Sequence, residues 1–186
     1  MQNNSGPQQL LDLLSSKGGE MYGGEQVTQL EHALQAALLA EEKGSTPELI
    51  TAALLHDIGH LLSEEFAVAE GLQQDDRHEW KAMGVLKEMF PETVTTPIQM
   101  HVAAKRYLCA IDPSYEAGLS EASINSLRLQ GGKMTSEEVE QFEQHPLLDD
   151  VLQLRRWDDQ AKVPGLETPP LSHFEAYVEQ AVGGTQ

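Results

Sequence analysis

The sequence predicts an all-α protein organised as a single domain over residues 1–186. Apolar residues recur at helical spacing along most of the chain, helix-start signals separate these segments, and nothing resembles a run of alternating strands. A chain of 186 residues can bury roughly two thirds of its unfolded surface in one core. The expected architecture is therefore one helical globule.

The N-terminal part of the chain is expected to form three helices. The first covers about residues 7–16 and ends at Gly18-Gly19, because glycine favours the backbone conformation that closes a helix. The second follows the sequence YGGE. Thr46 caps the third, Pro47 lies in its first turn, and this helix is expected to carry AALLHDIGHLL at residues 52–62.

The rest of the chain is also expected to be helical. A helix from about His78 to Phe90 stops at Pro91, and another opens at Thr96-Pro97. DPSYEAG, at 112–118, has the composition of a turn. Further helices are expected in LSEASINSLRLQGG (119–132), at 136–144 behind the capping box of Thr135 and Glu138, in HPLLDDVLQLRRWDDQAK (145–162), and at the end of a C-terminal tail (163–186).

Charge and cysteine usage narrow the possible partners and compartments. The chain has 12 Lys and Arg against 30 Asp and Glu, and its net charge of -18 should repel nucleic acid backbones and anionic lipids. Cys109 is the single cysteine, so no intramolecular disulfide can form. The N-terminal MQNNSGPQQL lacks signal-peptide features, and no segment is apolar enough to span a membrane. We expect a cytoplasmic protein with no nucleic acid or membrane partner.

Histidines lie close to apolar positions in several predicted helices. A single buried histidine is most often a core residue with both ring nitrogens satisfied, because an unpaired polar group costs about 1 to 3 kcal/mol. Here Asp57 adds a carboxylate next to one histidine, and Asp158 ends an apolar stripe on another helix. Divalent metal ions explain such a set better than chance polarity does. The four histidines are on separate predicted helices: His32, His56, His78 and His101.

The order His32, His56-Asp57, Asp158 resembles the signature of the HD-domain superfamily, an all-helical metal-dependent fold. His78 and His101 are similar to the additional ligands of its dinuclear members. The resemblance implies a dinuclear site in a core of about residues 22–162. It implies a first ion held by His32, His56, Asp57 and Asp158, and a second held by His78 and His101 with Asp57 as the bridge.

The metal ligands alone leave three classes of function open. Most HD-domain proteins are phosphohydrolases, a minority are di-iron oxygenases, and a regulatory domain without turnover would be expected to lack some ligands. Three cations stand one helical turn from a ligand, namely His60, Lys105 and Arg155, which suits a dianion such as a phosphate or phosphonate. Glu25 would add a negative group suited to an ammonium. Together they indicate a small zwitterion.

Several segments are similar to the PhnZ-type HD-domain oxygenases, which are mixed-valence di-iron enzymes. These segments are YGGEQVTQLEHALQAALLAEEKG, AALLHDIGHLL, RHEWKAMGVLK, HVAAKRYLC, LSEASINSLRLQGG and LRRWDDQAK. The resemblance implies two iron ions, Fe(II)/Fe(III), and O2. It implies that Tyr22 ligates the second iron in the substrate-free state and that Glu25 holds a substrate amine. The phosphonate would be held by His60, Lys105, Ser123, Gln130 and Arg155.

We therefore predict a dioxygenase that cleaves the carbon–phosphorus bond of (1R)-2-amino-1-hydroxyethylphosphonate to glycine and phosphate. Tyr22, Glu25, His60 and Lys105 are the predicted catalytic residues. Two alternatives are an oxygenase for the trimethylammonio analogue, which would form glycine betaine, and an HD-domain phosphohydrolase. Glu25 can reach a small primary ammonium and favours the unmethylated substrate.

Overall fold

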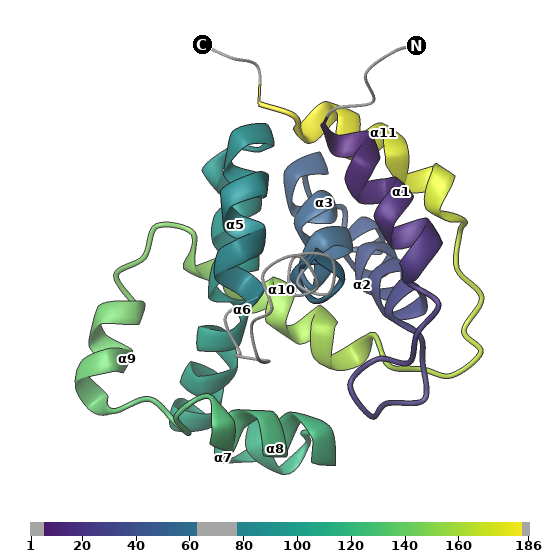
Figure 1. Ribbon diagram of the computed structural model, residues 1–186. Coiled ribbons are helices and arrows are strands. Elements are labelled where there is room, and N and C mark those ends of the chain that lie inside the picture. Colours follow the sequence, from purple (N-terminus) through teal and green to yellow (C-terminus); the bar gives the residue numbers. More distant parts are fainter. Residues whose placement is uncertain (1–5, 63–77, 184–186) are drawn as a thin grey trace, which may run out of the picture.

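The computed structural model describes residues 6–62 and 78–183, without the side chains of 78–82, and this part of the chain is helical (Figure 1). Within it, the one β-type pairing is an isolated bridge between Met21 and Thr28. The all-α prediction is therefore confirmed. The helices are α1 (Pro7–Lys17), α2 (Gln29–Glu42), α3 (Pro47–Leu55), α5 (His78–Met89), α6 (Glu92–Ile111), α7 (Pro113–Ala117), α8 (Glu121–Leu129), α9 (Ser136–Phe142), α10 (Leu148–Gln160) and α11 (Leu171–Ala181).

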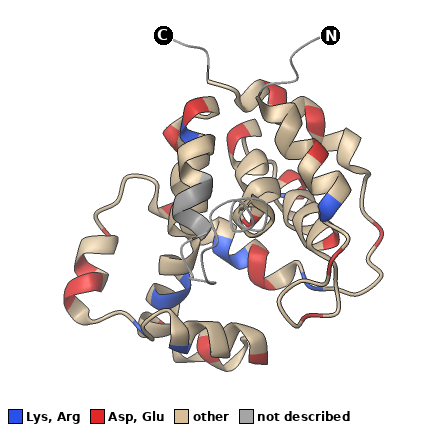
Figure 2. Cartoon of the chain, viewed as in Figure 1, with Lys and Arg blue, Asp and Glu red and all other residues tan. Residues whose placement is uncertain are grey.

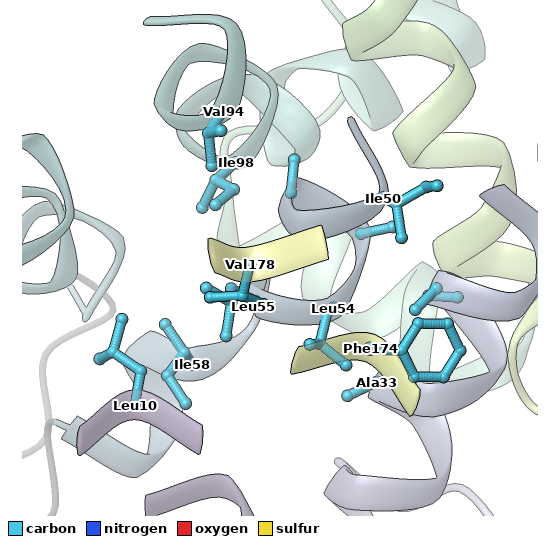
Figure 3. Close-up of a cluster of buried hydrophobic side chains, with 14 of the residues drawn as sticks. Leu10, Ala33, Ile50, Leu54, Leu55, Ile58, Val94, Ile98, Phe174 and Val178 are labelled. Atoms are coloured by element: carbon cyan, nitrogen blue, oxygen red, sulfur yellow. The ribbon is translucent and has the colours of Figure 1, made fainter. Parts of the chain in front are cut away.

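Helix α3 is the centre of the main core. All of its residues from Leu49 to Leu55 are buried, which is typical of a helix that is covered on every side. It contacts α2, α6, α10 and α11. Figure 3 shows Leu54 and Leu55 of α3 beside Phe174 and Val178 of α11, which belong to the same buried cluster. The final helix therefore covers the central one.

Helices α6 and α10 connect this core to a second apolar cluster that includes α9. Tyr107 and Leu108 of α6 pack there with Phe142 of α9 and Val151 of α10. Figure 1 shows α7, α8 and α9 on the side of the molecule away from α1 and α11. The long α6 therefore passes from one cluster to the other, and its middle part is available for a site between them.

The chain turns at His56 and Asp57, and helical structure resumes over 58–62. The expectation of one helix through AALLHDIGHLL is wrong. The Ala53 carbonyl, which a continuing helix would offer to the Asp57 amide, accepts a hydrogen bond from His56 Nδ1 at 2.8 Å. Adjacent side chains on a regular helix diverge by about 100°. At this turn the two adjacent side chains converge instead, because His56 Nε2 lies 3.5 Å from Asp57 Oδ2.

Helix α6 begins at Glu92 and contains Pro97, so the predicted start at Thr96-Pro97 is wrong. Pro91 takes the capping position, and its carbonyl accepts hydrogen bonds from the amides of Val94 and Thr95. Glu92 places negative charge at the positive end of the helix. The helix is therefore initiated upstream, and the missing amide hydrogen of proline is accommodated near its start.

Local capping explains several other boundaries. The predicted turn at 112–118 is wrong, because Asp112 caps the short helix α7 by accepting from the Ser114 amide at 2.9 Å. The capping box of Thr135 and Glu138 is confirmed. A second capping box, between Thr28 and Glu31, starts α2. The division of the chain into a core of about 22–162 and a tail of 163–186 stays a prediction.

Acidic residues occur on most helices, while Lys and Arg on α6 and α10 lie on two helices that contact each other (Figure 2). This arrangement places cations inside a strongly acidic protein, at the junction that holds the candidate site.

None of the helices in the described part of the chain combines the length and the apolar character that crossing a membrane requires.

Candidate metal centre and substrate pocket

Four helical segments bring predicted metal ligands to one buried point. His32 comes from α2, His56 and Asp57 from the turn after α3, His101 from α6 and Asp158 from α10. The three histidines and Asp158 are at most 4 % exposed. Among the described residues, donor atoms of His32, His56 and Asp158 lie within 4.8 Å of one another. The sequence-predicted set is therefore brought together, apart from His78.

The side chain of His78 lies outside the described residues. Helix α5 begins at His78, and α5 contacts α6, which carries His101. The assignment of His78 as a ligand stays a prediction.

Each of the three described histidines is anchored through its Nδ1 atom. His32 donates to the Ala161 carbonyl at 2.8 Å, His56 to Ala53 at 2.8 Å and His101 to Ile98 at 2.6 Å. Because a carbonyl can only accept, each Nδ1 carries the hydrogen. In the neutral imidazole, the ring lone pair is then on Nε2. This tautomer is the one that metal-binding histidines adopt when a backbone carbonyl fixes the ring.

The Nε2 atoms and carboxylate oxygens face one another without the hydrogens needed to pair them. His32 Nε2 lies 3.0 Å from His56 Nε2 and 3.4 Å from Asp158 Oδ1. Asp57 Oδ2 and Asp158 Oδ1 are buried and lack a hydrogen-bond partner among the described groups. Two donors bound to one ion at about 2.0 to 2.2 Å lie about 2.8 to 3.6 Å apart. The arrangement therefore fits a cation between these four atoms.

Asp57 faces two groups of donors with its two oxygens. Oδ2 lies 3.5 Å from His56 Nε2 and 3.8 Å from His32 Nε2, whereas Oδ1 lies 3.5 Å from His101 Nε2. A carboxylate in this position can ligate one ion through each oxygen. The geometry thus fits a carboxylate that bridges two ions.

The protonation states favour metal binding over internal ion pairing. Burial lowers the pKa of His56 to about 4, so this imidazole is neutral at pH 7. Burial raises the pKa of Asp57, but the nearby imidazoles, chiefly His56, outweigh it and hold that pKa well below its usual range. For Asp158, burial likewise raises the pKa, and the Arg155 guanidinium more than compensates. Ionised carboxylates therefore face a neutral His56 imidazole.

Tyr22 lies on the loop that precedes α2 and covers the cluster. Its ring stacks on His32 with centroids 3.9 Å apart and planes inclined by 14°. Burial, followed by the negative charges of Asp158 and Asp57, raises the pKa of Tyr22 well above its usual value. The loop turns at Gly23 and Gly24, whose φ angles of 43° and 87° favour glycine. Tyr22 thus lies against the cluster, and its ligation of the second iron stays a prediction.

A cavity of about 240 Å³ opens beside the cluster. It reaches Tyr22, Asp57, His101 and Asp158, so a bound ligand would contact the metal site directly. All six predicted substrate residues line it as well. These residues are Glu25, His60, Lys105, Ser123, Gln130 and Arg155.

The cations of this cavity are buried and held by polar neighbours. Lys105 Nζ donates to Ser126 Oγ at 2.6 Å, and burial together with Arg155 lowers the pKa of Lys105 to about 8. Arg155 Nη1 lies 2.8 Å from Asp158 Oδ2, and the guanidinium also pairs with Asp159. Arg155 therefore orients the predicted ligand Asp158 while it faces the cavity.

Two of the predicted phosphonate residues, His60 and Gln130, differ in how deeply they are buried. The His60 side chain is 43 % exposed, and its Nε2 lies 3.8 Å from Asp57 Oδ1. Gln130 lines the cavity with a buried Oε1 that has no hydrogen-bond partner among the described groups. The Gln130 amide thus presents an unpaired acceptor oxygen at the cavity, whereas holding a phosphonate oxygen would require its Nε2 donor.

Sequence reasoning missed several residues of the site. Lys162 lines the cavity, Ser126 holds Lys105, and Gln35 is buried one turn after His32. Lys162 lies four residues after Asp158, but α10 ends at Gln160, so the helical spacing that identified Lys105 from His101 does not apply to it. With Lys105 and Arg155 it brings three of the chain's 12 Lys and Arg to this cavity.

The family model "HD domain" matches residues 30–101, which include His32, His56, Asp57 and His101. The chain is 48 % identical over 174 residues to a hydroxymethylphosphonate dioxygenase of Gimesia maris, covering 93 % of this chain and 86 % of the relative. It is 45 % identical over 170 residues to the glycine-betaine-forming [1-hydroxy-2-(trimethylamino)ethyl]phosphonate dioxygenase of Leisingera caerulea, covering 91 % and 87 %. The chain therefore belongs to the family of HD-domain phosphonate dioxygenases, which are oxidoreductases that act with O2.

Proposed function

We propose that the protein uses O2 to cleave the carbon–phosphorus bond of (1R)-2-amino-1-hydroxyethylphosphonate, forming glycine and phosphate in organophosphonate catabolism. One observation carries this proposal. The cavity beside the histidine cluster contains both buried cations, Lys105 and Arg155, and the carboxylate of Glu25. Such a lining matches a zwitterion that has a phosphonate and an amine.

The proposed cofactor is a pair of iron ions, Fe(II)/Fe(III), which would supply the redox chemistry with O2. The first would be held by His32, His56, Asp57 and Asp158. The second would be held by His78 and His101 with Asp57 as the bridge, and by Tyr22 before substrate binds. Two observations support this assignment. The histidine lone pairs are on Nε2, and one oxygen each of Asp57 and Asp158 has no hydrogen-bond partner among the described groups.

The protein's own residues would bind and orient the substrate. His60, Lys105, Ser123, Gln130 and Arg155 would hold the phosphonate oxygens, and Glu25 would hold the amine. This fixes the carbon that bears the hydroxyl beside the metal cluster, which supplies the positioning part of catalysis. Both atoms of O2 enter the products, because the substrate plus O2 has the composition of glycine plus phosphoric acid. The reaction needs no water.

Tyr22 would couple substrate binding to access at the metal. Its hydroxyl is buried near Asp57 and Asp158, and its loop bends at two glycines with positive φ. A substrate that takes the place of Tyr22 at the metal would displace the ring from His32. The glycine pair gives the loop the freedom for this displacement.

Two related substrates are the competing candidates. The trimethylammonio analogue also has a cation for Glu25, but three methyl groups prevent a hydrogen bond to that carboxylate. Hydroxymethylphosphonate has no cation, and one observation favours it: Lys162 Nζ lies 3.5 Å from Glu25 Oε1, so the carboxylate already has a counter-charge. The family assignment favours all three over the phosphohydrolase alternative.

Product analysis tests the reaction class. Protein loaded with iron without oxygen should release phosphate and glycine from the aminated substrate only after O2 is added. Phosphate release without O2, or with Mg or Mn in place of iron, would overturn the oxygenase proposal in favour of hydrolysis.

Replacing Glu25 with Ala or Gln tests the amine assignment. We expect the KM for 2-amino-1-hydroxyethylphosphonate to rise about 10- to 100-fold, the value of a charge-assisted hydrogen bond, while the KM for hydroxymethylphosphonate changes little. Steady-state O2 uptake with both substrates measures this. Equal effects on the two substrates would remove the proposed role of Glu25.

A further inference from the structure

Lys162 occupies the same corner of the cavity as Glu25. Its side chain is 12 % exposed, and Nζ donates to Ser123 Oγ at 3.1 Å. The same ammonium lies 3.5 Å from Glu25 Oε1 and 5.8 Å from the centre of the Tyr22 ring. Lys162 thus contacts a proposed phosphonate residue, the proposed amine acceptor and the aromatic cover of the cluster.

The backbone on both sides of Lys162 is fixed by buried residues of α2. His32 Nδ1 donates to the Ala161 carbonyl at 2.8 Å. The Gln35 amide pairs with both backbone groups of Val163, donating to its carbonyl at 2.9 Å and accepting from its N–H at 3.0 Å. Lys162 lies beyond the end of α10, so these contacts, and not helical hydrogen bonds, fix its backbone position. The ammonium of Lys162 therefore extends from a backbone that is held on both sides.

The partners of Lys162 are linked to each other. Ser120 Oγ donates to Glu25 Oε1 at 2.6 Å and lies 3.2 Å from Ser123 Oγ. Glu25 Oε1 thus faces a hydroxyl and an ammonium of the protein itself. A substrate amine that binds Glu25 must share or replace the Lys162 ammonium. A phosphonate without an amine meets a Glu25 carboxylate whose negative charge is already balanced by the Lys162 ammonium.

We propose that Lys162 determines specificity as the resident counter-cation of Glu25. An ammonium-bearing phosphonate displaces the Lys162 ammonium from Glu25, and Lys162 then stays with Ser123 beside the phosphonate. With a phosphonate that lacks an amine, Lys162 remains on Glu25 and prevents repulsion between that carboxylate and the dianion. This inference rests on the proposed function, because it requires that phosphonates bind in this cavity.

Binding of two matched probes tests the inference without turnover. The probes are 2-aminoethylphosphonate and propylphosphonate, which have the same number of heavy atoms and differ by ammonium against methyl. Calorimetry on iron-loaded protein without oxygen gives the dissociation constant of each probe. The measured ratio is that of propylphosphonate divided by that of 2-aminoethylphosphonate. In Lys162→Met we expect this ratio to rise at least about tenfold, because only the aminated probe still neutralises Glu25. The rise should come mainly from weaker binding of propylphosphonate.

Further variants isolate the pair. In the double variant Glu25→Gln/Lys162→Met the two probes should bind with nearly equal affinity, and Lys162→Arg should keep the wild-type ratio because the cation remains. Lys133→Met is the matched control, because Lys133 pairs with Glu116 at an exposed position and should leave the ratio unchanged. Thermal unfolding of each variant checks that it is folded.

Three outcomes would overturn the inference. They are an unchanged ratio in Lys162→Met, an equal loss for both probes, and a raised ratio that persists in the double variant. If Lys162→Met is unfolded, the comparison of Lys162→Gln with Lys162→Arg decides by the same criterion. Absence of O2-dependent glycine formation together with the expected ratio shift would overturn the proposed substrate while leaving the role of Lys162 intact.

Discussion

Replacing His101 with alanine is expected to lower the iron content of anaerobically loaded protein from about two ions per chain to about one, and to reduce kcat/KM at least about 10³-fold. Of the described histidines in the cluster, His101 has its Nε2 opposite Asp57 Oδ1, whereas His32 and His56 face Asp57 Oδ2. Its loss should therefore empty one position and leave the other. Iron analysis and O2 uptake on the same preparation measure both effects.

The matched control for this change is His173→Ala. His173 is a partly exposed histidine that pairs with Glu41 at 2.7 Å, away from the cluster, and its removal should keep both ions. Asp57→Asn should lower occupancy at both positions, because its two oxygens face both groups of donors. A His101→Ala protein that keeps two ions and full activity would contradict the assignment of a second position.

Replacing Lys105 with methionine is expected to lower kcat/KM about 10²- to 10³-fold, mainly through KM, because a buried ammonium beside a phosphonate dianion contributes more than a neutral hydrogen bond. Lys105 is 3 % exposed, and its ammonium is held at the cavity by Ser126. Kinetics with a range of substrate concentrations separate KM from kcat. Lys133→Met again serves as the surface control.

The pH dependence of the same residue gives an independent readout. Burial, with repulsion from Arg155, lowers the pKa of Lys105 to about 8. Its cationic form, which would bind the phosphonate, is populated below this pKa and is lost as the pH rises through it. We expect kcat/KM to fall about tenfold per pH unit above pH 8 on this limb. Lys105→Arg, which stays charged, should remove the limb, and its persistence in that variant would assign it to another group.

Most helices could be predicted because they depend on local spacing, whereas the ligand assignment came from the resemblance to the HD-domain superfamily, which spacing alone does not supply. His32, His101 and Asp158 are each one member of a helical pattern, and a helix fixes where its side chains point relative to its apolar face. Thr46 and Thr135 were recognisable as caps for the same reason. Positions governed by the next three or four residues are thus readable from the chain.

The features that the sequence did not reveal depend on contacts between distant segments. The turn at His56 and Asp57 is coupled to a side-chain hydrogen bond that competes with the helix, which spacing cannot show. Gln35 and Val163 are 128 residues apart, and their pairing is what places Lys162. Once α10 has ended, no periodicity predicts where Lys162 points. Its proposed role depends on Glu25 and Ser123, which only the fold brings beside it.

Labelling with ¹⁸O2 is the most direct test of the central claim, which is that the protein is a dioxygenase that breaks a carbon–phosphorus bond. Iron-loaded protein should convert 2-amino-1-hydroxyethylphosphonate to phosphate with one ¹⁸O atom and glycine with one ¹⁸O atom in its carboxylate, because both atoms of O2 are needed to balance the products. Mass spectrometry of both products gives the result. Phosphate whose new oxygen comes from labelled water, formed together with unlabelled 2-aminoethanol in place of glycine, would contradict the account and identify a hydrolase.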